Sequence, residues 1–283
     1  MSFLDTFCSL KETRNINAKL KDLYGVWHRG LKIYNTNDSQ LNGKSLNPLH
    51  LLTCTDSYLK KMVMIFGQEA HDTNNAWTIN KSPEDYYLTE FPYDLAIHNC
   101  DRQKAPRTLF LKQRILLAGM DKECANRAFT EDEKQAFHCE LINNLNKTSF
   151  AGDHLGVISN GLLARIYDPF EYEGIWGTIF EHELNILRPR RIVFLTGKSY
   201  WGHMERDFRT IFAYGCLGKL MREQVMNLNM SSKPVSDPVE FRYGSWSPEE
   251  DCRAVVCYHP NARMRKDVRE ALYDKVMLDF VNS

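Results

Sequence analysis

The sequence predicts an α/β protein with three α/β/α layers around a central, four-stranded, mainly parallel sheet. Short, continuous apolar runs recur along the chain, as is typical of strands buried on both faces of a parallel sheet. Stretches with helical periodicity separate these runs, and alternating strands and helices imply crossover connections between parallel strands. The four expected strands are residues 62–66, 140–142, 192–195 and 254–258.

Helices are expected where apolar spacing agrees with start and stop signals. Residues 1–60 form a helical extension in this interpretation, and residues 61–283 form the α/β domain. Apolar side chains between residues 20 and 27 recur at helical spacing. Thr130 precedes an acidic first turn, which is a helix-start signature. Besides residues 1–60, where a short second helix covers 49–60, the expected helices are residues 130–139, 172–187, 200–212 and 266–282.

The composition is that of an ordinary globular protein, with 43% hydrophobic and 25% charged residues among 283. The 36 basic and 36 acidic residues balance, which argues against nonspecific coating of duplex DNA but leaves room for a local basic patch. Eight cysteines without a CxxC pair predict reduced thiols in a cytoplasmic protein, with no metal site and no cofactor. We expect no membrane partner, because no apolar run approaches the roughly 20 residues of a membrane-spanning helix.

A polar segment, residues 67–72, follows the first expected strand. Gly67 allows a sharp turn and a close approach of the backbone to a ligand. Glu69 and Asp72 are carboxylates that can orient or deprotonate a water molecule. An ordinary loop that starts a helix explains the same residues, because acidic side chains favour helix N-termini.

Amide side chains follow the second expected strand, over residues 143–147. The side chain of Asn144 offers a donor and an acceptor together, which suits the edge of a nucleobase. Lys147 is placed to meet a phosphate. A turn is the competing interpretation, because asparagine is common in turns.

A histidine follows the fourth expected strand, in the segment His259-Pro260-Asn261-Ala262-Arg263. Histidine at a strand end can donate a hydrogen bond to an oxygen that gains negative charge. A solvated turn histidine is the competing interpretation. Ligands of open α/β sheets bind beyond the carboxyl ends of the strands, so the three segments together predict a site there.

A metalloprotease motif is excluded at His182-Glu183, which begins like HExxH. The second histidine would stand at position 186, where the sequence has Ile186.

In this order, the three strand-end segments resemble the motifs of the uracil-DNA glycosylase superfamily. The segment over residues 67–71 is similar to a G-Q-D-P-Y-type motif, residues 144–147 to an N-x-x-K segment, and residues 259–261 to an H-P-S motif. The resemblance covers residues 60–280. It departs from the family pattern at Ala70, His71 and Asn261, which replace proline, tyrosine and serine.

The resemblance implies hydrolysis of the N-glycosidic bond of a damaged base that is flipped out of DNA. Glu69 would activate water and stabilise the positive charge on the sugar. His259 would donate to the departing base, and Asn144 and Gln68 would bind its edge. Trp77 would stack on the base, although packing in the core explains a tryptophan equally well.

Contacts with DNA are implied for Lys147, Asn261 and Arg263, the last near the position of a residue that wedges into the base stack. The expected partner is therefore DNA or a nucleotide ligand. A non-catalytic module of the same fold, which binds a base, nucleotide or nucleic acid, is the alternative, favoured by the neutral charge and the changes at Ala70 and His71. A nucleotide-processing hydrolase is a third possibility, because a fold alone does not dictate function.

Overall fold

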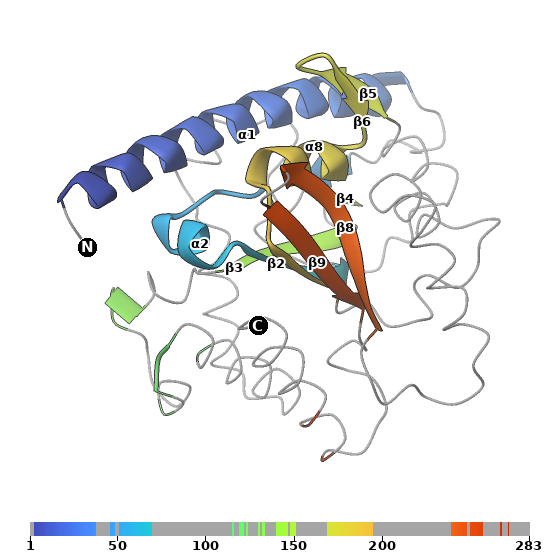
Figure 1. The fold of residues 1–283 in the computed structure, drawn as a ribbon. Coiled ribbons are helices and arrows are strands. Elements are labelled where there is room, and N and C mark those ends of the chain that lie inside the picture. The colour runs from blue at the N-terminus through green and yellow to red at the C-terminus, as the bar shows by residue number, and fades with distance from the viewer. Residues whose placement is uncertain are drawn as a thin grey trace.

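The computed structural model shows a protein that mixes helices with parallel strands (Figure 1). It describes residues 3–37, 46–48, 51–69, 140–146, 148–150, 169–194, 239–247 and 250–256, and single positions between 115 and 133 and at 267 and 271. The helices of this part of the chain are α1 (Phe3–Asn37), α2 (Asp56–Lys61) and α8 (Ile179–Leu187). Two short strands, β1 (Leu46–Pro48) and β4 (Thr148–Phe150), form a separate antiparallel pair.

The central sheet has the strand order β3-β2-β7-β9-β8. β2 (Val63–Glu69) pairs in parallel with β3 (Glu140–Asn146) and with β7 (Arg191–Phe194). β7 pairs in parallel with β9 (Glu250–Val256), and β8 (Val239–Ser247) pairs with β9 in the antiparallel direction. The expected strands are therefore neighbours in one sheet, and Ile65 is the register partner of Val193.

Among the described residues, the sheet has five strands where four were predicted, because the prediction omits β8. The sequence of β8, VEFRYGSWS, interrupts its apolar residues with charged and hydroxyl side chains. A search for continuous apolar runs finds strands that are buried on both faces and misses strands of this mixed kind.

Both faces of the parallel part of the sheet are buried. One row of register partners lies in the same hydrophobic cluster as α1 and α8, and each member is at most 1% exposed: Leu141, Met64, Ile192 and Ala254. Since successive side chains of a strand point to opposite faces, the alternate positions belong to the other face. They are buried to the same degree: Val63, Ile65, Val193 and Val255.

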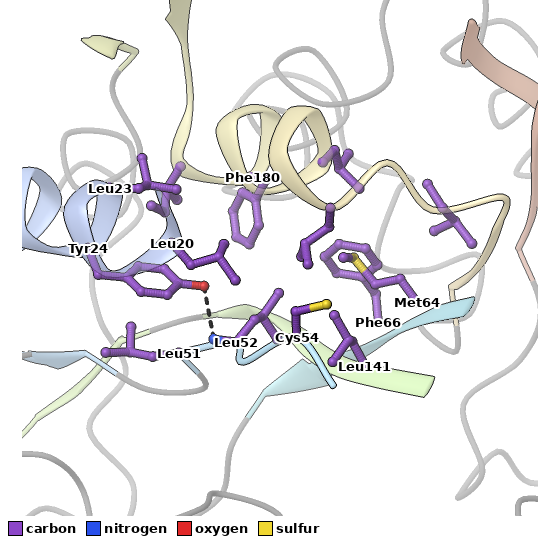
Figure 2. Close-up of a cluster of buried hydrophobic side chains, with 14 of the residues drawn as sticks. Leu20, Leu23, Tyr24, Leu51, Leu52, Cys54, Met64, Phe66, Leu141 and Phe180 are labelled. Atoms are coloured by element: carbon purple, nitrogen blue, oxygen red, sulfur yellow. Dashed lines mark hydrogen bonds between the residues drawn. The ribbon is translucent and has the colours of Figure 1, made fainter. Parts of the chain in front are cut away.

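The helix α1 packs on the sheet through an apolar stripe. Leu20, Leu23 and Tyr24 lie in one cluster with Phe66 of β2 and Phe180 of α8 (Figure 2). The helical spacing predicted between residues 20 and 27 is confirmed, and its apolar face is the buried one. The N-terminal helix therefore shares its hydrophobic core with the sheet.

The helix α8 runs back along the sheet, against the direction of the strands. It ends at Leu187, four residues before β7 begins at the amino edge of the sheet. Its first turn lies toward the carboxyl edge of the sheet. There the ring of Phe180 meets the ring of Phe66 edge-on, with 6.2 Å between the ring centroids. Phe66 in turn stacks on Phe194 at 4.9 Å.

A β-hairpin replaces the first part of the helix expected over residues 172–187. β5 (Phe170–Tyr172) and β6 (Ile175–Gly177) pair in the antiparallel direction. The two residues between them have positive φ, 48° at Glu173 and 76° at Gly174, as two-residue hairpin loops of type I′ require. The prediction of a helix was wrong for residues 172–178, because the packing of the hairpin and the conformation of its turn outweigh the apolar spacing of these seven residues.

The start of α8 is fixed by a capping box. The side chain of Thr178 accepts from the backbone N–H of Glu181, and the carboxyl of Glu181 accepts from the backbone N–H of Thr178. This pattern satisfies two backbone donors that a helix start leaves without partners. The predicted end of the helix before Pro189 is confirmed, with Arg188 in the left-handed conformation.

The helix expected over residues 49–60 is shorter than predicted. The side-chain amide of Asn17 accepts from the backbone N–H of Cys54 at 2.7 Å and donates to its carbonyl at 2.9 Å. These bonds hold residues 51–54 outside any helix, and Thr55 then caps α2 by accepting from Tyr58 N–H at 3.0 Å.

Two of the other three expected helices are described in part. The predicted start at Thr130 is confirmed: its hydroxyl accepts from Glu133 N–H, and the Glu133 carboxyl accepts from Thr130 N–H. Asp267 and Ala271 are helical, as expected for residues 266–282. The expected helix over residues 200–212 lies outside the described residues.

A buried hydrogen-bond chain joins α1 to α8. The hydroxyl of Tyr24 accepts from the backbone N–H of Leu52 at 2.9 Å, the bond drawn in Figure 2, and donates to Oε1 of Glu183 at 2.5 Å. Both side chains are fully buried, at 0% exposure. A polar group at such depth is costly without partners, so these bonds fix α1 against α8 and against the segment before α2.

We expect Tyr24→Phe to lower the free energy of unfolding by about 2–3 kcal/mol, because it removes a donor from a buried carboxyl and an acceptor from a buried N–H. Urea denaturation measures this loss. Tyr172→Phe is the matched control: its hydroxyl donates to the carbonyl of Lys19 at 3.0 Å in a partly buried position, so a loss of about 0.5–1 kcal/mol is expected. Equal losses of stability for the two variants would contradict the larger contribution expected of the Tyr24 hydrogen bonds.

Two glycine substitutions should shift stability in opposite directions. A Cβ atom at Gly30 or at Gly174 meets nothing within 4 Å, so backbone conformation decides. Gly174→Ala should cost about 1–2 kcal/mol, because its φ is positive. Gly30→Ala in α1 should add about 0.5–1 kcal/mol of stability, because alanine is the better helix former. Thermal unfolding of both variants tests this, and a stabilised Gly174→Ala would exclude the described hairpin turn.

Candidate functional site

Two predicted site residues stand on adjacent parallel strands. β2 extends to Glu69 and β3 to Asn146, so the polar segments after the expected strands continue the sheet. Gly67 is the register partner of Asn144, and Glu69 is the partner of Asn146. Residues 143–146 are therefore strand and not a turn, whereas residues 70–72, where a helix would start, lie outside the described residues.

A common row of the sheet sets the level of the strand ends. Asn143, Phe66, Phe194 and Val256 are successive register partners across four parallel strands. Asn144 follows this row by one residue and Glu69 by three. Neighbouring parallel strands lie about 4.8 Å apart, which places these two backbone positions close together at the carboxyl edge of the sheet.

The remaining predicted site residues lie outside the part of the chain that the structure describes: Trp77, Lys147, His259, Asn261 and Arg263. Gln68, Glu69 and Asn144 are described as backbone positions within strands. Gln68 and Glu69 thus follow the register partner of Asn144, which is Gly67, by one and two residues on the adjacent strand. The segment that holds His259 begins directly after β9, which runs in the same direction as β2 and β3.

Asn143 anchors the carboxyl end of β3 from the core side. Its Nδ2 donates to Oε2 of Glu183 at 2.9 Å, and it is fully buried at 0% exposure. Glu183 also accepts from Tyr24 (above), so one carboxyl connects α1, α8 and β3. Because positions along a strand alternate between faces, Asn143 and Asn144 belong to opposite faces.

The sequence interpretation overlooked this role of Asn143 and Glu183. A signal was present: Asn143 stands two residues after Leu141, at the period that places both on one face of a strand. An asparagine at a core-facing position needs a polar partner. In the sequence, Glu183 stands out only in the incomplete HExxH pattern that begins at His182.

His182 and Glu183 are both engaged in structural contacts. His182 Nε2 lies 3.0 Å from the carbonyl oxygen of Phe170, and its ring packs against Phe170 and Tyr172 at 4.7 and 5.6 Å. The described residues include no group of three or more His, Cys, Asp or Glu side chains that could hold a metal ion.

Two titratable groups near this core are shifted by burial. Burial raises the pKa of Glu181, against the lowering effect of its hydrogen bonds with Thr178. Burial, together with the negative charges of Glu12 and Asp56, raises the pKa of the Cys54 thiol to about 12. Cys54 is therefore protonated at neutral pH, and a thiol needs to ionise to act as a nucleophile.

Comparison with protein-family models, with curated proteins and with solved structures finds no match to this chain. Among the described residues, no helix is both long and apolar enough to cross a membrane.

The neighbouring asparagines should differ in the effect of substitution. We expect Asn143→Leu to lower the free energy of unfolding by about 2–3 kcal/mol, because it removes a donor from the buried carboxyl of Glu183. Asn144→Leu should leave stability nearly unchanged if Asn144 serves recognition. Urea denaturation of the two variants, which carry the same chemical change one residue apart, gives the comparison. A greater loss for Asn144→Leu would reverse the roles assigned to the two residues.

Proposed function

We propose that the protein is a divergent uracil-DNA glycosylase-like enzyme that hydrolyses the N-glycosidic bond of a damaged base flipped out of DNA. The observation that carries the proposal is the parallel register that sets Glu69 beside the amide-rich end of β3. Ligands of open α/β sheets bind at this edge. A carboxylate and an amide from adjacent strands are the groups that water activation and base recognition need.

The third group is His259, three residues after the end of β9. Val256 is level with Phe66 across two strand spacings, and three residues of chain span at most about 11 Å. This connectivity supports a role for His259 at the edge where β2 and β3 end. His259 then serves as the donor to the oxygen of the departing base, which gains negative charge as the bond breaks.

The reaction follows from these roles. Water attacks the anomeric carbon of the sugar, the bond from that carbon to the base nitrogen breaks, and the base leaves with the bonding electrons. Glu69 orients the water, takes its proton and stabilises the positive charge of the sugar. Asn144 and Gln68 hold the edge of the base, and Trp77 stacks on its face. Lys147, Asn261 and Arg263 contact the DNA.

The finer architecture belongs to the same proposal: three α/β/α layers of the glycosylase type. Burial of Ile65 and Val193 on the face away from α1 and α8 supports it. The competing function is a binding module on the same fold without cleavage. Ala70 and His71, where the family motif has proline and tyrosine, favour that alternative.

The decisive experiment incubates the protein with oligonucleotides that contain uracil, hypoxanthine or a mismatch, followed by alkali, which breaks the strand at abasic sites. Excision should persist in a chelator, because the proposed groups act without a metal. Binding of one of these oligonucleotides without cleavage would favour the binding module. Neither binding nor cleavage would overturn the assignment to DNA.

We expect Asn144→Asp to abolish uracil excision or to shift it toward cytosine, because the aspartate loses the donors that match the uracil edge. His259→Gln should slow excision by about 100-fold or more. Excision rates are measured beside thermal unfolding for both variants. Normal excision by Asn144→Asp with a lowered melting temperature would remove Asn144 from the site. Ile33→Ala, which changes an exposed side chain of α1 that has no role in the proposed site, serves as the control.

A further inference from the structure

The solvent-facing side of α1 carries a line of basic residues. They follow one another at intervals of three, seven, eight and three residues, which is the spacing of positions on one face of a helix. All five are exposed, and together they are called the basic stripe: Lys11, Arg14, Lys21, Arg29 and Lys32. Lys21 and Lys32 also interact with other residues of the chain, so the contacts with a partner are assigned to the other three.

Small residues fill the gaps in the basic stripe. Ala18 and Gly25 stand between Arg14 and Arg29, at positions of the same helix face. A Cβ atom at Gly25 would lie 3.8 Å from Nη1 of Arg29, so the Arg29 side chain runs back along the helix over this glycine. An extended partner can therefore approach the helix closely between the charged side chains.

The acidic residues of the same part of α1 act on other segments. Burial raises the pKa of Tyr172 in the hairpin to about 12, and the negative charge of Asp22 contributes to this rise. The charge of Glu12 acts on Cys54 (above). Six of the 36 basic residues but only three of the 36 acidic residues lie in α1, so the rest of the chain carries three more acidic than basic residues. The balanced total thus hides a positive helix on a negative remainder.

The residue types of the stripe select among anionic partners. A basic amphipathic helix binds a membrane by inserting its apolar face, but Leu20, Leu23 and Tyr24 of that face are buried in the core. Protein partners need an apolar centre in the interface, and single-stranded nucleic acids are held by aromatic side chains that stack on bases. The stripe offers charged and small residues alone, which suit the phosphates of a duplex.

The length of the stripe also fits a duplex. α1 is one continuous helix at the outer side of the described fold (Figure 1). From Lys11 to Lys32 it rises by about 32 Å, close to the ~34 Å of one turn of duplex DNA. A rod of this length laid along a duplex meets the backbones of both strands. Arg14 near one end and Arg29 near the other therefore reach separate phosphates.

We propose that the basic stripe of α1 binds the phosphate backbone of double-stranded DNA without reading its sequence. Lys11, Arg14 and Arg29 donate hydrogen bonds to phosphate oxygens and displace counterions from the duplex. The binding does not need cleavage at the strand-end site, and only the choice of DNA over RNA rests on the proposed function.

The test is fluorescence anisotropy of a labelled, undamaged DNA duplex of about 20 base pairs over a range of salt concentrations. The wild-type protein should bind it with an affinity that falls steeply with salt. Arg14→Gln should lower the slope of log affinity against log salt by about one, and the double variant with Arg29→Gln by about two, because each lost phosphate contact releases one counterion fewer. At low salt the double variant should bind about tenfold more weakly or worse.

Lys19→Gln is the matched control, because it removes the same charge from an exposed residue of the same helix. Nζ of Lys19 lies 3.6 Å from Oε2 of Glu173 in the hairpin, away from the stripe, so the salt slope should stay that of the wild type. Equal slopes for Arg14→Gln and Lys19→Gln, or no duplex binding by the wild type, would overturn the proposal.

Two further probes identify other partners, and both should bind more weakly than the DNA duplex. Tighter binding of an RNA duplex of the same sequence, lost in the double variant, would overturn the assignment to DNA. Tighter binding of a polyglutamate peptide, lost in the same variant, would overturn it in favour of an acidic protein segment. Since the DNA probe contains no damaged base, a failure of excision leaves this result standing, and a failure of duplex binding leaves the excision assay to be judged by itself.

Discussion

The carboxyl of Glu183 is the point on which the described structure depends. It is fully buried, and it accepts from Tyr24 of α1 and from Asn143 of β3 while standing on α8. A carboxyl at this depth is stable only when its partners are in place. Its bonds therefore specify one relative arrangement of α1, α8 and β3, where apolar contacts alone would tolerate small displacements.

The hydrogen bond between Asn143 and Glu183 also lies next to the candidate site. The side chain of Asn143 binds toward the core, and the next residue, Asn144, is the one proposed to recognise a base. The register between β2 and β3 continues past this point to Glu69 and Asn146. A rigid scaffold beneath a strand end keeps neighbouring recognition groups at fixed spacing, which differential binding of a transition state requires. The core and the proposed site thus meet at two consecutive residues of one strand.

The hairpin before α8 differs from the sheet, because only one of its faces is packed against the rest of the protein. Its inner face is tied to α1 and to His182, while its outer face leaves Trp176 and Glu171 in solvent. The capping box at Thr178 ends the hairpin and starts the helix within one residue. A change from strand to helix over so few residues fixes the direction of both elements, and it presents the outer face in one orientation.

The sequence by itself determined the elements whose signal is local. Continuous apolar runs located the four parallel strands, apolar spacing located the buried stripe of α1, and Thr130 marked a helix start. The order of the polar segments predicted that Glu69 and Asn144 stand near strand ends, and the register places them on adjacent strands, two residues apart along the strand direction. The tertiary structure decided what depends on distant partners. The edge strand β8 forms through its pairing with β9. The hairpin at residues 170–177 depends on the packing of its Phe170 and Tyr172 on His182, and the extended segment before α2 depends on Asn17. Asn143 and Glu183 are 40 residues apart, and only folding brings an amide and a carboxyl from such separation into one buried bond. The local sequence does not indicate such a distant partner. Two neighbouring asparagines that look alike in the sequence can therefore belong to opposite faces of the sheet, and only the fold shows which of them binds Glu183.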